Sequence, residues 1–410
     1  MNDDNARPSA FGNARQATPP ATKWRSIVLL LVAEVAAMSL WFVSAAVLPE
    51  MVREVAISSW RQAALSSAVQ LGFVAGALCF AVFGWADRYD PRRVFAISAV
   101  VAGLVNAALL VLPPDGNVAI AARFATGALM AGVYPVGMKI AVGWGVRDRG
   151  LLVGALVGAL TLGSASSHLI AWFGGADWRA TITIASLASI AAGFLVLASA
   201  LGPHHAWAGR LDPRAIFTAW TNRRVRLAYA GYLGHMWELY VMWSWIGVAA
   251  AVSYGASLPE ADAVSLAKIT AFVAIAAGGV SSIAAGFAAD RLGKANVALW
   301  AMAVSGTAAV ATALAFGGPP WLTFLIVTVW GLSVVPDSAQ FSALVADAAP
   351  PEQVGSLLAF QTALGFTLTF FTVQAAPMAA AAFGWPIVLA ALSFGPALGI
   401  AAMIRLKDIR

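Results

Sequence analysis

Two glutamates stand in the middle of long apolar runs of this 410-residue chain. Glu34 lies in "SIVLLLVAEVAAMSLWFVSAAVLP", and Glu238 lies in "LGHMWELYVMWSWIG". A carboxylate in apolar surroundings is costly unless it is paired, so such a residue usually serves binding or proton exchange. Desolvation favours the neutral form of a carboxyl group, which brings proton exchange toward neutral pH. His235, three residues before Glu238, adds a side chain that titrates near neutral pH without further help.

Each glutamate also shares its helical face with a thioether and an indole. Positions i, i+4 and i+7 stack on one side of an α-helix. At these steps the first glutamate is followed by Met38 and Trp41, and the second by Met242 and Trp245. The two acids therefore have matching surroundings, and they must be positioned by helices long enough to carry these faces.

The composition places those helices in a lipid bilayer. Hydrophobic residues make up 60% of the chain and charged residues 11%, whereas soluble domains carry about 25% charged residues. A helix needs roughly 20 apolar residues to cross a hydrocarbon core about 30 Å thick, and it pairs its backbone groups internally. The sequence predicts an all-α integral membrane protein with twelve spans. They cover approximately residues 25–48, 63–84, 94–112, 118–141, 150–172, 180–201, 227–252, 265–288, 295–316, 321–344, 355–376 and 385–404.

Lysine and arginine are distributed unevenly between the two sides of these spans. Of the 25 basic residues, 19 fall in the tails and the alternate loops of one side. Basic loops stay in the cytoplasm, so we expect both termini to be cytoplasmic and the chain to lie in a cell inner membrane. Contact with anionic headgroups explains the basic balance, which leaves little support for a nucleic-acid partner. The lone Cys79 lies within a predicted span, so a disulfide framework is excluded.

The chain contains an internal repeat of about 200 residues. Asp87-Arg88 in "FGWADRYDPRR" recurs as Asp290-Arg291 in "GFAADRLGK", 203 positions later, and the two buried glutamates are 204 positions apart. We predict two related six-helix bundles. Residues 1–23 form a disordered tail, 24–201 the first bundle, 202–226 a loop with a surface helix, 227–405 the second bundle, and 406–410 a short tail.

Twelve spans in two halves, with an Asp-Arg loop after spans two and eight, resemble the major facilitator superfamily of secondary transporters. The resemblance covers residues 24 to 405. The loop motif of this family, Gly-x-x-x-Asp-Arg-x-Gly-Arg-Arg/Lys, is similar to "GFAADRLGK", whereas the first copy has Phe83 at the first glycine and Asp90-Pro91 in place of the inner Gly-Arg. The arginine and glycines of the span-four motif are similar to Arg123, Gly127 and Gly132.

The resemblance implies a cytoplasmic gate built by the two loops. Asp87 would dock at the start of span eleven near Gly355, and Asp290 at the start of span five near Gly150, because helix N-termini offer free N–H groups and a positive dipole. The neighbouring basic residues would meet acids or lipid phosphates; they are Arg88, Arg92, Arg93 and Arg291. The alternative is that these loops only anchor the chain at the membrane surface.

The resemblance also implies that spans one, four, seven and ten surround a central cavity, with the two glutamate faces opposite each other. The predicted site comprises the coupling set Glu34, Glu238 and His235, the candidate charge partner Arg123, and the further residues Met38, Trp41, Met242, Trp245, Tyr134, Asp337 and Gln361. The alternative for each glutamate is an inter-helix hydrogen bond that only stabilises the bundle.

The sequence thus predicts a monomeric secondary active transporter that moves a small solute or ion by alternating access. A proton gradient would drive it, without a cofactor or resident metal. "GALVGALTLGSASS" in span five lacks the proline usual in antiporters of the family, which disfavours antiport. No nucleophile–base set or phosphate loop indicates an enzyme.

Three alternatives remain open: a soft-metal (copper) importer, a drug or metabolite exporter, and a non-transporting membrane receptor or assembly factor. The donors that copper(I) prefers are present as His235, Met38, Met236 and Met242. However, Leu239 stands where the His-x-x-x-Met pattern of such importers has methionine.

Overall fold

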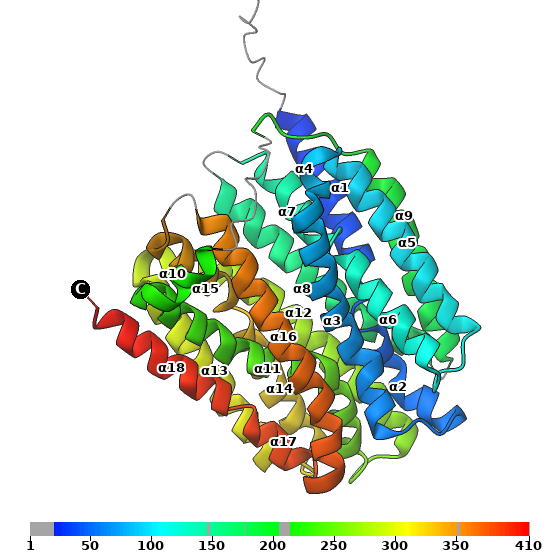
Figure 1. Ribbon diagram of the computed structural model, residues 1–410. Coiled ribbons are helices and arrows are strands. Elements are labelled where there is room, and N and C mark those ends of the chain that lie inside the picture. The colour runs from blue at the N-terminus through cyan, green and yellow to red at the C-terminus, as the bar shows by residue number, and fades with distance from the viewer. Residues whose placement is uncertain (1–19, 146–147, 176, 205–213, 351–352, 410) are drawn as a thin grey trace, which may run out of the picture.

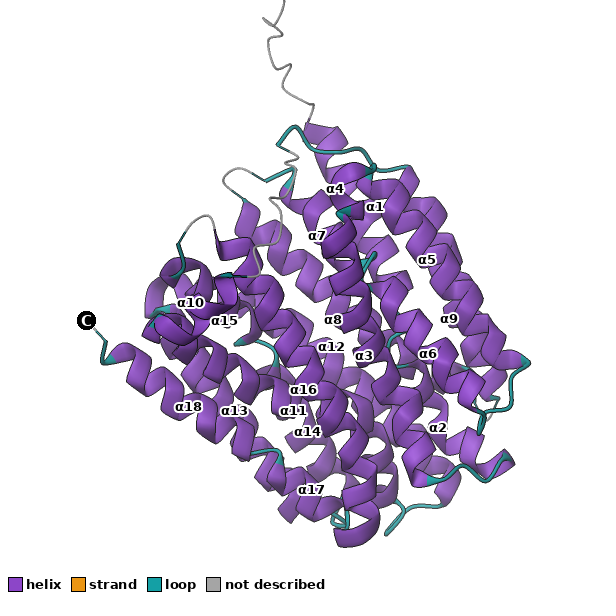
Figure 2. Ribbon diagram, viewed as in Figure 1, coloured by secondary structure: helices purple, strands orange, loops and turns teal. Residues whose placement is uncertain are grey.

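The computed structural model describes residues 20–145, 148–175, 177–204, 214–350 and 353–409. These residues form helices joined by short loops (Figure 2). These ranges contain no strand. The predicted N-terminal tail, apart from its last four residues, lies outside them, as do residues 205–213 of the predicted inter-bundle loop.

The described residues of the first half form nine α-helices and one short 3₁₀ helix. They are α1 (Pro20–Met38), α2 (Val43–Glu54), α3 (Ser59–Phe83), α4 (Trp85–Arg88), α5 (Pro91–Ala107), η1 (Ala108–Leu110), α6 (Asn117–Met130), α7 (Tyr134–Val142), α8 (Arg149–Phe173) and α9 (Trp178–Leu197).

The second half begins with the short helix α10 and repeats the pattern of long helices. They are α10 (Ala215–Thr221), α11 (Arg223–Tyr254), α12 (Glu260–Leu292), α13 (Lys294–Leu314), α14 (Pro320–Val334), α15 (Ser338–Ala348), α16 (Val354–Phe383), α17 (Trp385–Ala391) and α18 (Phe394–Lys407).

Eleven segments of the described chain are long and apolar enough to cross a bilayer. The twelfth predicted span corresponds to α11, whose 32 residues exceed the roughly 20 that a crossing requires. Four tyrosines and three tryptophans lower the mean hydropathy of α11. The predicted all-α fold with twelve spans is confirmed, while the bundle boundaries drawn from the repeat stay a prediction.

Among the described residues, four of the spans are interrupted by short non-helical segments. The breaks fall at residues 39–42, 131–133, 335–337 and 392–393. Pro336 lies inside the third break, and Pro135 lies in the first turn of α7, directly after the second break. Proline lacks the N–H that a continuous helix needs, which explains interruptions at these two places. Backbone that is not helical at membrane depth has to be buried in protein or line a cavity, so the breaks mark where a site is expected.

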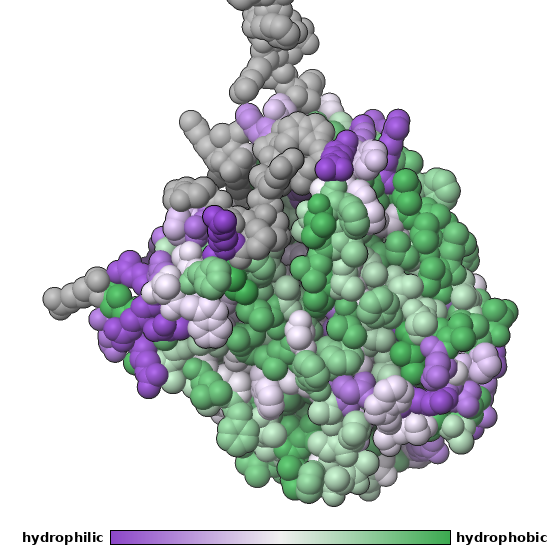
Figure 3. Space-filling view, in the orientation of Figure 1, coloured by the Kyte–Doolittle hydropathy of each residue, from purple (hydrophilic) through white to green (hydrophobic). Residues whose placement is uncertain are grey.

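The described chain starts and finishes at one end of the molecule (Figure 1). We call the end where α1 begins and α18 finishes the tail end, and the opposite end the distal end (Figure 1). The halves contact each other mainly through α3 with α16 and α8 with α12. Figure 3 shows hydrophobic residues across a broad band of the visible face and hydrophilic ones toward its ends, as expected for a bilayer-embedded protein.

Glycines of the fourth span allow close contact with neighbouring helices. A Cβ atom at Gly127 would lie 2.0 Å from the carbonyl oxygen of Val69, and one at Gly132 would lie 2.1 Å from Oγ of Ser98. Larger residues would push α6 away from α3 and α5. The glycines after Arg123 therefore bring that arginine close to the first three spans.

Candidate functional site

Arg123 of α6 holds the break in the first span. Its guanidinium donates to the carbonyl oxygens of Leu40 at 3.0 Å and Trp41 at 2.8 Å, which the end of α1 leaves free. It also donates to the carbonyl oxygen of Leu65 and to Oδ1 of Asn106. Arginine carries five donors in a rigid fork, which suits several acceptors at once. These partners are all neutral, so the prediction that Arg123 is the charge partner of a buried acid is wrong.

Glu34 is fully buried in α1 and has no hydrogen-bond partner for either carboxyl oxygen among the described residues. Its carboxyl group lies against Gly137 of α7, where an added Cβ atom would be 2.7 Å from Oε2. Only a glycine leaves room for the acid at this point. Glu34 therefore lies buried within the first half, where an ionised carboxylate without a cationic partner would be an unpaired buried charge.

Glu238 is equally buried, but both of its oxygens are satisfied. Oε1 accepts a hydrogen bond of 2.6 Å from the indole of Trp330 in α14, and Oε2 accepts one of 2.9 Å from Ser305 in α13. The prediction that Glu34 and Glu238 face each other across one cavity is wrong, since each carboxyl group points into its own half. Glu238 makes the inter-helix hydrogen bonds of the alternative interpretation.

His235 and Asp337 form a buried pair between α11 and the break in the tenth span. Nδ1 of His235 lies 2.9 Å from Oδ1 of Asp337, and the side chains are 1% and 2% exposed. The sequence singled out both residues without pairing them. Gln361 of α16 is also buried, and its Nε2 has no hydrogen-bond partner in the described part of the chain.

Aromatic rings join the halves where the first span is broken. Trp41 lies 6.1 Å from Tyr240 of α11 and 5.7 Å from Phe366 of α16, measured between ring centroids. Phe42 packs edge-on against Trp243 at 5.7 Å. This cluster fills the space between the halves with packed rings.

The predicted thioether and indole walls belong to this packed interior. All four residues are at most 3% exposed; they are Met38, Trp41, Met242 and Trp245. Trp245 donates from its indole to the carbonyl oxygen of Val373 in α16. None of these four residues is among the described residues that line the cavity between α3 and α16, so their role at a solute site stays a prediction.

The cavity, of about 470 Å³, lies between α3, α16 and the segment that contains the break in the fourth span and α7. Of the predicted site residues, Tyr134 lines it. Its wall residues in α3 and α16 belong to the portions of these helices nearer the tail end. The cavity thus lies on the tail side of the aromatic cluster.

Lys268 of α12 joins the two halves at the distal end, and sequence reasoning missed it. Its ammonium lies 2.8 Å from Oε1 of Glu50 in α2 and donates to the carbonyl oxygens of Ala171 and Gly175 at the end of α8. Lys268 and Glu50 are both buried. The available signal was a lysine inside an apolar run of span eight, which intramembrane placement makes a candidate for function.

Further contacts close the same end. Ser67 donates to Oε1 of Gln374 at 2.6 Å, and Nε2 of Gln374 donates to the carbonyl oxygen of Trp60. At the surface, Arg53 pairs with Glu260 at 2.6 Å. Each contact runs from the first half to the second, so the structure is a conformation closed at the distal end.

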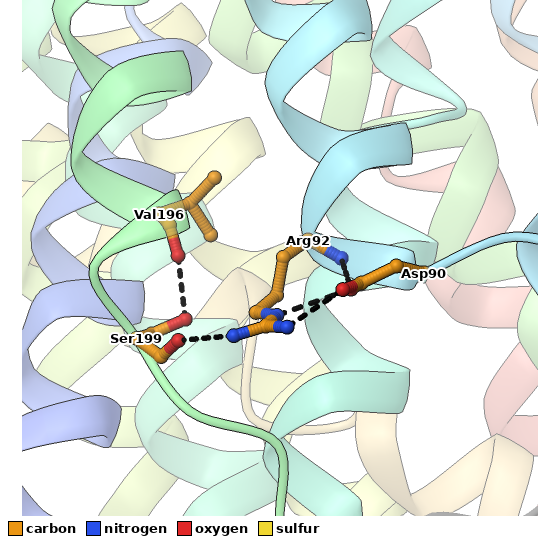
Figure 4. A network of polar contacts seen from close by, with 4 residues as sticks. All are labelled: Asp90, Arg92, Val196 and Ser199. Carbon is orange, nitrogen blue, oxygen red and sulfur yellow. Dashed lines mark hydrogen bonds and ion pairs between the residues drawn. The ribbon is translucent and has the colours of Figure 1, made fainter.

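The first copy of the loop motif ties two helix ends together within the first half. Asp90 caps α5 by accepting from the backbone N–H of Arg92, and its carboxylate pairs with that guanidinium at 2.6 Å (Figure 4). Arg92 also donates to the carbonyl oxygen of Ser199 after α9. Hydrogen bonding to Arg92 lowers the pKa of Asp90 below its usual value. Asp90-Pro91 thus serves as an N-cap followed by proline at the first helical position.

The described side chains of the predicted gate residues do not form a closed gate in this conformation. The side chain of Asp87 lies outside the described residues, and Arg88 and Arg93 are exposed. In the second copy Asp290 and Arg291 are exposed as well. A Cβ atom at Gly150 or Gly355 would have no neighbour within 4 Å. Their gating role stays a prediction.

The second copy of the loop nevertheless mirrors the first in one respect. Lys294 at the start of α13 pairs with Asp347 near the end of α15 at 2.5 Å. Asp290 borders the same hollow in the surface. In both halves a basic residue after the motif therefore connects a helix start to the end of another span.

The chain belongs to the Major Facilitator Superfamily, whose family model matches residues 29–371. No curated protein sequence matches the chain. The protein is therefore a multi-pass membrane protein with the fold of a family of secondary transporters, and this family and fold are not those of an enzyme.

Solved structures agree on the fold at low sequence identity. A D-xylose–proton symporter has a TM-score of 0.72 at 12% identity, covering 94% of this chain and 97% of its own. The xylose transporter XylE from E. coli, in a partially occluded inward-open conformation, has a TM-score of 0.70 at 12% identity and coverages of 95% and 99%. The nucleoside transporter NupG has a TM-score of 0.70 at 14% identity and coverages of 93% and 99%.

Proposed function

We propose that the protein imports a small solute together with a proton, and that Glu34 carries the proton. The observation that supports this most is the setting of Glu34: full burial, two oxygens without described partners, and contact with α7. Ionised, this group would be an unpaired charge in a buried, low-dielectric interior, which costs far more than an unsatisfied neutral carboxyl group. The conformation closed at the distal end therefore favours the protonated acid.

Helix α7 connects the proton site with the cavity. Gly137 of α7 lies against Glu34, while Tyr134 and Val136 of the same short helix line the cavity. The break at 131–133 separates α7 from α6, so α7 can shift without the rest of the span. A proton on Glu34 and a solute in the cavity then bias the same element, which is what coupling between two sites requires.

The remaining titratable groups take different roles in this proposal. Glu238 is a positioning residue that fastens α11 to α13 and α14, since both of its oxygens already accept hydrogen bonds. His235 and Asp337 join α11 to the break in span ten. His235 lies against a carboxylate, which favours proton chemistry over the methionine-rich coordination of the soft-metal alternative.

Charge and fold support the orientation that we propose for the chain. Basic residues at the tail end support our assignment of both termini to the cytoplasm of an inner-membrane protein, and with this orientation the cavity would open inward. A structural neighbour is described as a D-xylose–proton symporter, which supports proton symport on this fold. We assign the active unit as a monomer without a cofactor, and the Asp-Arg loops as its cytoplasmic gate.

Uptake into proteoliposomes under an imposed pH gradient tests the proposal, with organic acids, amines and neutral aromatic solutes as the screened set. Glu34→Gln should abolish accumulation driven by the gradient but retain exchange of labelled solute across the membrane. Glu238→Gln, at an equally buried acid, is the matched control and should keep the gradient dependence. Gradient-driven accumulation by Glu34→Gln at the wild-type level would refute the assignment.

A further inference from the structure

The cavity between α3, α7 and α16 has an aromatic floor. Phe73 and Phe366 both line it, and their ring centroids are 4.6 Å apart. Trp41 packs on the two rings at 5.1 and 5.7 Å. The volume of about 470 Å³ falls within the range of roughly 300 to 1,000 Å³ typical of small-molecule sites. A solute entering from the tail end would stop on these rings.

The walls of the cavity offer almost no hydrogen-bonding side chains. Of the seventeen described lining residues, fifteen have hydrocarbon or thioether side chains. The hydroxyl of Thr362 donates to the carbonyl oxygen of Leu358 in its own helix, at 2.9 Å. The Thr362 oxygen can still accept a hydrogen bond, and the Tyr134 hydroxyl is the group of this described lining that can also donate to a solute.

We propose that this cavity binds a neutral solute with an aromatic or similar apolar ring and one polar group directed at Tyr134, and that it rejects sugars and nucleosides. The inference rests on the proposed function, because it names the solute class of that transporter. Each sugar hydroxyl that loses water without gaining a partner lowers affinity by about tenfold. A ring instead gains contact with Phe73, Phe360 and Phe366.

An acyl chain of a membrane lipid shares the apolar chemistry of such a solute. Leu78 lines the cavity and is 44% exposed, so an apolar chain can reach this wall. A ring solute differs from an acyl chain in stacking on the floor and in meeting the hydroxyl of Tyr134. Substitution of Tyr134 therefore separates the two occupants.

Isothermal titration calorimetry on the purified full chain in detergent tests the assignment, with indole, D-xylose, uridine and dodecane as probes. Ala363→Trp and the smaller Ala359→Leu fill the cavity from α16. Ala382→Trp adds an indole at an exposed position near the other end of that helix and controls for folding and for partition of indole into micelles. Tyr134→Phe removes the hydroxyl.

Indole should bind the wild type and Ala382→Trp equally well. It should bind Ala363→Trp at least tenfold more weakly, and Ala359→Leu and Tyr134→Phe several-fold more weakly than the wild type. D-Xylose and uridine should not bind. Absence of indole binding, or binding of D-xylose that Ala363→Trp abolishes, would overturn the solute class. So would displacement of indole by dodecane with no effect of Tyr134→Phe.

The outcomes also distinguish the two proposals. If a sugar accumulates under a pH gradient and Ala363→Trp stops it, the solute class fails while proton coupling stands. If indole binds as expected but its addition moves no protons into the proteoliposomes, the cavity assignment stands and proton-coupled import fails.

Discussion

Lys268 and Glu50 form a buried ion pair that joins the two halves of the protein at the distal end, with 2.8 Å between Nζ and Oε1. The same ammonium donates to the carbonyl oxygens of Ala171 and Gly175 at the C-terminal end of α8, where the helix dipole favours a cation. A conformation open at the distal end has to break these contacts together.

Loss of the ammonium should therefore open the distal end. Lys268→Met leaves Glu50 buried without its cation, which typically costs about 3–5 kcal/mol. In a Cys79→Ser background, Ser67→Cys places a thiol at a contact between the halves. A membrane-impermeant maleimide should label it at least about tenfold faster in Lys268→Met than with Lys268 retained, since 1.4 kcal/mol already corresponds to tenfold.

Two controls make this labelling result specific. Lys268→Arg keeps the charge and should label slowly, and a cysteine at the exposed Trp60 should label quickly in every background. Equal labelling of Ser67→Cys with and without the lysine would show that the ion pair does not hold the distal end closed.

Arg123 should be required for folding more than for charge balance. Arg123→Met would leave the carbonyl oxygens of Leu40 and Trp41 and the amide of Asn106 without a donor, at a cost of at least about 3 kcal/mol. Arg123→Lys should recover only part of this, because a single ammonium cannot reach every acceptor. Thermal unfolding in detergent measures the effect.

Arg179→Met provides the comparison for that series. Arg179 pairs with Glu54 at the surface, with half of its side chain exposed, so its loss should cost less than about 1 kcal/mol. An equally small loss for Arg123→Met would contradict the role of Arg123 at the break.

The Asp90 carboxylate should make a small, pH-dependent contribution to stability. Its pKa is lowered in the folded protein by the hydrogen bond with Arg92, so the contribution is present above the unfolded pKa of about 3.9. It is lost as the pH falls through the lower folded pKa. Asp90→Asn keeps the N-cap and removes the charge. Because the pair is partly exposed, we expect a difference of about 0.5 kcal/mol at pH 7.

Unfolding curves of wild type and Asp90→Asn at several pH values check this. Their difference should shrink as the pH drops below about 4, with the wild type approaching the variant. A difference that stays constant down to pH 2 would mean that the ion pair does not contribute.

The depth and burial of the acids could be predicted from the sequence, whereas their partners could not. Counting residues from the basic ends of the spans places Glu34 and Glu238 near mid-membrane, and both are buried. Their partners depend on which neighbour supplies a donor, as Trp330 does for Glu238. That choice is made by tertiary packing and leaves no mark in the local pattern.

The prediction that Trp41 shares a face with Glu34 failed for a physical reason. Spacing of i and i+7 aligns two side chains only along a continuous helix, and α1 ends at Met38. Prolines point to the interruptions of spans four and ten, but the break at 39–42 contains none. The distant Arg123 stabilises it, and local residue types do not reveal that contact.

Infrared difference spectroscopy of the full chain in lipid, followed across a pH titration, tests the protonation of Glu34 most directly. At neutral pH we expect a carbonyl stretch of a protonated carboxylic acid that disappears in Glu34→Gln and persists in Glu238→Gln. Identical protonated-acid bands in the wild type and Glu34→Gln would show that Glu34 is ionised when the distal end is closed, which contradicts proton coupling through this residue.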